Sequence, residues 1–96
     1  MDRTEVYSKL YGILRTKANT KDMSFQLNSY FDGTSVISII MVKKDASVRL
    51  SMVVIPQENG YRVVSRSDVV ECDTISEVSN LLSRIITRTR LTFSKL

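Results

Sequence analysis

The chain has 96 residues, 43% of them hydrophobic and 25% charged, with a formal net charge of +4. The length leaves no room for a second hydrophobic core and the composition is too apolar for a disordered chain, so we predict a single domain over residues 1–96. The mild positive charge permits an anionic partner without requiring one.

The sequence offers little for catalysis, because it contains no histidine and a single cysteine, Cys72. Catalytic triads, the usual zinc sites and the commonest general base all need histidine. Cys72 stands between Glu71 and Asp73, whose charges oppose a thiolate, so we interpret it as structural. For the acids Asp68, Glu71 and Asp73 we favour solvation ahead of the last helix over a magnesium site. We therefore expect a protein without enzymatic activity, metal or cofactor.

The sequence carries no sign of a membrane or secretory segment. No apolar run approaches the length that crosses a bilayer, and no hydrophobic signal region precedes the first predicted element. The single cysteine cannot form an internal disulfide. We expect a cytoplasmic protein with no membrane span.

The first predicted elements are a helix and a strand. The helix runs from about Thr4 to Ala18, with an apolar stripe of Val6, Leu10, Ile13 and Leu14 at helical spacing. The strand runs from Met23 to Phe31, with Met23, Phe25, Leu27 and Phe31 on one face. Asp32-Gly33 then predicts a two-residue hairpin loop. This loop sets Phe25 opposite Ile40 and Met23 opposite Val42.

Three further strands complete the predicted sheet. The second includes Val36–Val42, and a three-residue loop of Lys44, Asp45 and Ala46 joins it to the third, Val48–Ile55. Even-numbered residues of the third strand then share the core face with Phe25; a two-residue loop would reverse them. A turn over residues 56–60 leads to a fourth strand, Tyr61–Arg66, and Ser67–Asp73 is open to interpretation as its extension after a bulge or kink.

The last element is a helix that opens with the capping box Thr74-Ile75-Ser76-Glu77. Its apolar stripe contains Val78, Leu81, Leu82, Ile85 and Ile86. The predicted fold is therefore α+β: an N-terminal helix, a four-stranded antiparallel meander and a C-terminal helix in a two-layer sandwich.

The segment from Thr87 onward admits two interpretations. As helix, it spreads its arginines around the axis, where they compensate the helix dipole; as a short strand, it aligns Arg88 and Arg90 in a basic strip. The strip would bind a phosphate backbone, although no glycine-rich loop or aromatic-plus-basic signature accompanies it. The candidate nucleic-acid-binding residues form a basic pole and are Arg84, Arg88, Arg90, Lys95, Lys43 and Lys44.

In the predicted register, Phe25, Ile40 and Leu50 point toward the helices. Several apolar residues then point to the other face of the sheet. Two short helices cover one face of such a sheet, so either they lie on opposite faces or an apolar patch remains for a partner. We expect a small intracellular interaction or regulatory protein that binds a protein partner, or itself as a homodimer, through this patch. The alternative is RNA or single-stranded nucleic-acid binding through the basic pole. The candidate partner-binding residues are Ile37, Ile39, Met41, Val53 and Ile55.

Overall fold

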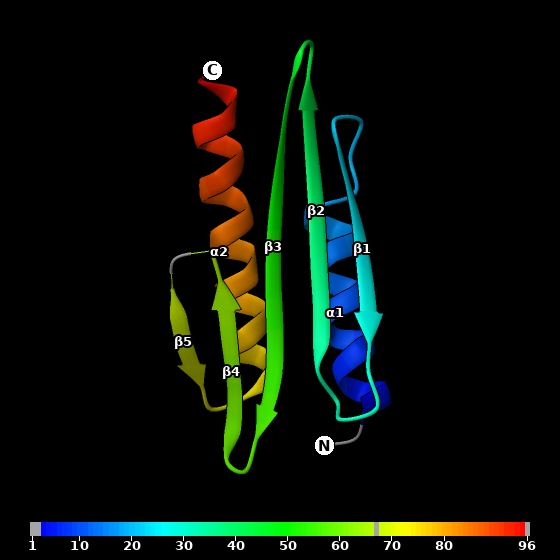
Figure 1. Cartoon of the computed structure of the whole chain (residues 1–96), viewed down its shortest axis with the longest axis vertical. Coiled ribbons are helices and arrows are strands. Elements are labelled where there is room, and N and C mark those ends of the chain that lie inside the picture. The colour runs from blue at the N-terminus through cyan, green and yellow to red at the C-terminus, as the bar shows by residue number, and fades with distance from the viewer. Residues whose placement is uncertain (1–2, 67, 96) are drawn as a thin grey trace.

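The computed structural model describes residues 3–66 and 68–95, which form two helices and a five-stranded antiparallel sheet (Figure 1). The strands follow one another in chain order across the sheet, each paired with the next. The α+β class and the antiparallel sheet are confirmed, but the sheet has five strands instead of four. In chain order the elements are α1 (Arg3–Lys17), β1 (Met23–Ser29), β2 (Ser35–Lys43), β3 (Ala46–Gln57), β4 (Gly60–Ser65), β5 (Val69–Cys72) and α2 (Ile75–Ser94).

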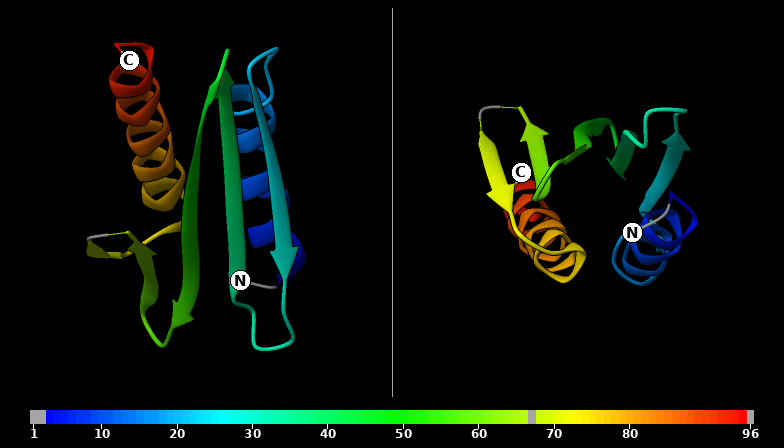
Figure 2. Two further views of the ribbon diagram at one scale, coloured as in Figure 1. Left: turned by 45° about the horizontal axis from the view of Figure 1, so that its top comes forward. Right: turned by 90° about the horizontal axis from the view of Figure 1, so that it is seen from below.

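Both helices lie side by side against the same face of the sheet (Figure 2). The hydrophobic core is the layer between them and the sheet, and its buried side chains come from both helices and all five strands. No described element covers the opposite face, which we call the open face. The core residues include Leu10 and Leu14 of α1, Ile37, Ile39 and Met41 of β2, Met52 and Val54 of β3, Val63 of β4, Cys72 of β5, and Val78, Leu82 and Ile86 of α2.

The first hairpin differs from its prediction by one residue. Tyr30 pairs with Thr34 through an N–H to carbonyl bond of 2.9 Å, and the Gly33 N–H donates to the Tyr30 carbonyl at 3.0 Å. The loop therefore has three residues, Phe31 to Gly33, and Gly33 adopts a φ of 88°. This is the arrangement of a type I turn followed by a left-handed glycine, whereas the predicted two-residue loop needs positive φ at Asp32 as well. The predicted place of Phe31 on the core face is wrong, since the loop exposes its side chain fully.

The second hairpin also differs by one residue. Lys43 pairs with Ala46, so the loop is Lys44-Asp45, with Lys44 at a φ of 50°, instead of the predicted three residues. The first hairpin therefore pairs Phe25 with Ile39 instead of Ile40, and the second pairs Ile39 with Leu50. The two differences cancel for β1 and β3, whose core faces are as predicted, but they reverse every side chain of β2.

The fifth strand replaces the predicted extension of the fourth. The chain turns back after Ser65, whose N–H donates to the carbonyl of Asp68 at 2.9 Å, and β5 pairs with β4. Ser67, where the predicted extension begins, lies outside the described residues. The interpretation of this segment as a continuation of β4 is wrong.

Helix α2 begins at the predicted capping box and continues past Thr87 as a helix. The Thr74 hydroxyl accepts from the Glu77 N–H at 3.2 Å, and the Glu77 carboxylate accepts from the Asp73 N–H at 2.8 Å. The helix runs without interruption to Ser94. The alternative in which a strand starts at Thr87 is wrong, and Phe93 is buried as a helical residue.

Candidate interaction surface

A row of four valines crosses the open face. Val36 of β2 pairs with Val53 of β3, Val53 pairs with Val64 of β4, and Val64 pairs with Val69 of β5. Directly paired residues of an antiparallel sheet point to the same face, so the four side chains stand side by side. We call them the valine row. Val69 is 61% exposed, and the other three are partly buried only by their neighbours in the sheet.

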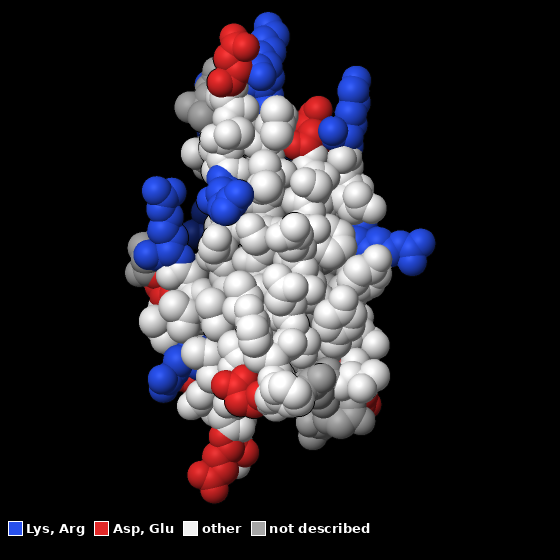
Figure 3. All heavy atoms as spheres, turned by 45° about the vertical axis from the view of Figure 1, so that its right-hand side comes forward, with Lys and Arg blue, Asp and Glu red and all other residues white. Residues whose placement is uncertain are grey.

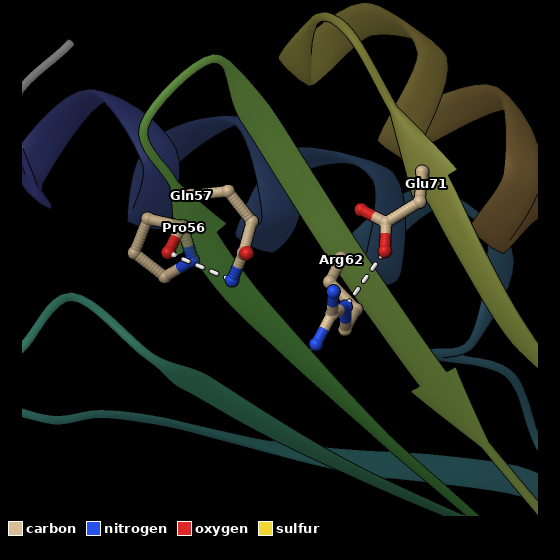
Figure 4. Close-up of polar contacts among 4 residues, drawn as sticks. All are labelled: Pro56, Gln57, Arg62 and Glu71. Atoms are coloured by element: carbon tan, nitrogen blue, oxygen red, sulfur yellow. Dashed lines mark hydrogen bonds and ion pairs between the residues drawn. The ribbon is translucent and has the colours of Figure 1, made fainter.

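An ion pair borders the valine row at β4 and β5. Arg62 and Glu71 are two residues from Val64 and Val69 and point to the same face, where Arg62 Nε lies 2.7 Å from Glu71 Oε1 (Figure 4). Both side chains are about half exposed, at 46% and 60%, so the pair contributes little to stability, about 1 kcal/mol at most. Its position matters more than its strength, because it marks a polar rim beside an apolar strip.

The uncharged surface is wider than the valine row. Ile40 and Val42 of β2 and Ile55 of β3 also point to the open face, with Val42 48% exposed. The oblique view in Figure 3 shows a broad uncharged centre with lysine, arginine and acidic side chains around its margin. This centre is mixed, because polar side chains such as Gln26, Ser38 and Ser51 lie on the same face as the apolar ones. Protein interfaces commonly combine apolar residues with a polar, charged rim in this way.

The five predicted partner-binding residues do not lie together. Val53 and Ile55 point to the open face, as predicted. The predicted place of Ile37, Ile39 and Met41 is wrong: their side chains are at most 2% exposed and pack beneath the helices. The one-residue difference in the first hairpin accounts for this inversion.

Most of the open face, including Val36, Val64 and Val69, was not predicted from the sequence. A signal for them exists in the valine doublets 53–54, 63–64 and 69–70. Because successive strand residues point to opposite faces, each doublet places one valine on each side of the sheet, whatever the register. Three such doublets in three consecutive strands predict apolar surface on both faces.

Two residues of the predicted basic pole bond to helix C-termini. Arg90 Nη2 donates to the Lys17 carbonyl of α1 at 2.7 Å, and Lys43 Nζ donates to the Ser94 carbonyl of α2 at 3.0 Å. Carbonyls of a last helical turn have no partner within the helix and carry the negative end of its dipole. Arg90 and Lys43 thus act as capping groups, and Arg90 also links the end of α2 to the end of α1.

The remaining four predicted nucleic-acid-binding residues do not form one group. Arg84 lies in a shallow hollow with Glu77 and Asn80, whereas Arg88 lines a separate groove beside β3. Lys44, in the second hairpin loop, and Lys95, after the end of α2, are the chain neighbours of Lys43 and Ser94 and therefore flank their hydrogen bond. The aligned strip of Arg88 and Arg90 does not form, since both belong to a continuous helix.

Replacing Arg90 with alanine is expected to lower the free energy of unfolding by about 1 kcal/mol, because the Lys17 carbonyl loses its charged donor. Arg88→Ala is the matched control, since the Arg88 guanidinium donates to no described residue, and it should change stability by less than about 0.5 kcal/mol. Urea unfolding followed by circular dichroism measures both. Equal losses in the two variants would show that Arg90 has no capping role.

The chemistry-bearing residues do not assemble into a reactive site. Burial, followed by the charge of Glu77, raises the pKa of Cys72, so its thiol stays protonated at neutral pH. Glu71 pairs with Arg62 on the open face, while Asp68 lines the groove beside β3. Across residues 3–66 and 68–95, no three acidic or sulfur ligands come close enough to hold a metal ion.

Comparisons with protein-family models, with curated proteins and with solved structures each found no match for this chain. Neither α1 nor α2, over their described residues, is both long and apolar enough to cross a membrane. A proposal about function therefore rests on the open face and the basic residues described above.

Proposed function

We propose that the protein is a non-enzymatic binding protein whose open face docks a macromolecular partner, in the simplest case a second copy of the same chain. The valine row carries this proposal. Burial of apolar side chains stabilises a complex by about 25 cal/mol for each Å² of apolar surface removed from water. Here four valine side chains lie in register across four strands.

The dimensions of the open face suit such a contact. Five strands spaced about 4.8 Å apart span roughly 20 Å across the sheet. The nine residues of β2, at about 3.4 Å each, give the face a length of roughly 30 Å. A specific interface of ordinary size buries roughly 800 Å² on each partner. Two open faces packed on each other would come close to this area and would turn the molecule into a sheet-on-sheet sandwich.

The alternative, nucleic-acid binding through the basic pole, has less support. Two of its six residues, Arg90 and Lys43, cap helices. Lys44 and Lys95 flank the hydrogen bond between Lys43 and Ser94, whereas Arg84 and Arg88 line two different hollows. Phosphate binding of useful strength needs several cations that follow one backbone. The open face is therefore the better-supported binding surface.

The test is the oligomeric state of Val53→Glu, which places a carboxylate at the centre of the valine row. Burying an unpaired charge is costly, so the dissociation constant of the dimer should rise about tenfold or more. Sedimentation equilibrium over a range of concentrations measures it. Thr87→Glu is the matched control, because it adds a carboxylate at an exposed position of α2, on the other side of the sheet, and should leave the dimer unchanged.

Two results would contradict the proposal in its simplest form. One is a wild-type chain that stays monomeric up to ~1 mM, where even a weak dimer is populated. The other is a dimer that Val53→Glu and Thr87→Glu affect equally. Thermal unfolding of each variant separates loss of the interface from loss of the fold.

A further inference from the structure

A second uncovered element is the first half of β3. β3 has 12 residues, and β2 pairs with it from Ala46 to Val54. β4 pairs only with Met52–Gln57. Residues 46–51 therefore have β2 on one side and no described strand on the other. Figure 1 shows β3 extending beyond the end of β4.

The register tells which backbone groups point to this free edge. Lys43 and Ala46 close a two-residue loop and form a hydrogen-bonded pair, so even-numbered residues of β3 bond to β2. The two-residue loop between Gln57 and Gly60 independently directs odd-numbered residues toward β4. Ser47, Arg49 and Ser51 therefore point their N–H and carbonyl groups into the gap where a strand next to β3 would lie.

A groove of about 550 Å³ runs along this edge. The edge of β3 forms one wall, and the second half of α2 and the β4–β5 reversal form the rest. Its apolar part includes Val63 and Leu81, which are buried, and Leu50 and Ile85, which are partly buried. An added strand would place alternate side chains over these residues.

The charge of the groove is positive. Arg49, Arg66 and Arg88 line it against one acid, Asp68. All three arginines are exposed, and no described residue forms an ion pair with any of them. They come from β3, the β4–β5 reversal and α2, so the fold gathers three separate cations around one backbone edge.

We propose that this groove binds an extended acidic peptide segment, which adds to β3 as a neighbouring strand. Backbone bonds to residues 47–51 would supply the register, apolar side chains would lie over Leu81 and Ile85, and carboxylates would meet the arginines. This segment is a better occupant than a second copy of the same edge, because that pairing would bring two sets of arginines together. It is also a better occupant than a nucleic acid, because a nucleic acid has no peptide backbone to pair with the free edge of β3 and no aliphatic side chains to cover the apolar part of the groove.

The probe is a short fluorescein-labelled peptide in which glutamate and valine alternate, with a labelled oligouridine as comparison. Fluorescence anisotropy should show peptide binding that weakens as salt rises, and hydrogen exchange should slow at the amides of Ser47, Arg49 and Ser51. Absence of peptide binding, or tighter binding of oligouridine than of peptide, would overturn the proposal.

Two pairs of variants separate the backbone and charge contributions. Ser51→Pro removes an outward N–H without breaking the ladder to β2 and should weaken peptide binding about tenfold, whereas Ser51→Ala keeps that N–H and the affinity. Arg88→Glu should weaken binding about tenfold, but Arg84→Glu, on the same helix outside the groove, should not. Equal affinities within either pair would contradict strand addition at this groove. The side chain of Ser51 points to the open face, whereas Arg84 and Arg88 belong to α2 on the other side of the sheet, so the arginine pair tests the groove independently of the dimer.

Discussion

Replacing Ile39 with lysine is expected to unfold most of the protein, whereas lysine at the adjacent Ile40 should leave it folded. Ile39 is fully buried between β1, β3 and the helices, so lysine there loses the apolar burial and places an unpaired ammonium in the core. The cost is roughly 3 kcal/mol or more, a large part of the 5–15 kcal/mol that stabilises a domain of this kind.

Ile40 is the matched control because it carries the same side chain on the same strand, one residue away on the open face. Its change to lysine should cost about 1 kcal/mol or less. Thermal and urea unfolding, followed by circular dichroism, measure both variants. The opposite order, with Ile40→Lys the more damaging, would mean that the first hairpin has the two-residue loop and that β2 is reversed.

The sequence predicts the helices and the alternation of the strands well, because both follow from local periodicity. The stripe of α1, the capping box at Thr74 and the core faces of β1 and β3 are all where the pattern places them. Register is different, since it depends on the length of each loop. Asp32-Gly33 fits a two-residue loop and the last two positions of a three-residue loop equally well, and only the pairing of Tyr30 with Thr34 distinguishes them.

The fifth strand was missed for a related reason. The segment from Ser65 to Asp68 carries a weak turn signal in its two serines and Asp68, which also fits the interpretation as a bulge or kink. It contains none of the strongest turn residues, glycine, proline and asparagine. The carbonyl of Asp68 accepts from the Ser65 N–H and closes the reversal without them. The doublet Val69-Val70, which follows at once, then forms the edge strand and completes the valine row.

The role of the basic residues could not be read from their charge. Arg90 and Lys43 resemble solvent-exposed cations in sequence, and each lies far along the chain from the helix end that it caps. Arg49, Arg66 and Arg88 are likewise separated, and only the tertiary fold gathers them around the free edge of β3. Surfaces of this kind are assembled by long-range packing, which the periodicity of the sequence does not predict.

Gly60→Ala is expected to be among the most destabilising single changes, although it adds only one methyl group. Gly60 opens β4 at a φ of 149°, a conformation that residues with a side chain rarely adopt. A Cβ atom there would overlap the carbonyl oxygen of Cys72 and lie 3.3 Å from the Cα of Asp73. These atoms are backbone and cannot rotate away, so β4 would have to separate from β5, at a cost of about 2–5 kcal/mol.

Gly12→Ala is the matched control, and its effect should have the opposite sign. Gly12 lies in α1, and a Cβ there would meet nothing within 4 Å. Alanine loses less backbone entropy than glycine when a helix forms, so stability should rise by about 0.5–1 kcal/mol. Urea unfolding of the two variants gives both values. If Gly60→Ala were neutral, the close approach of β4 to the Cys72 carbonyl would be wrong, and with it the sharp turn from β5 into α2 that positions Thr74 as a cap.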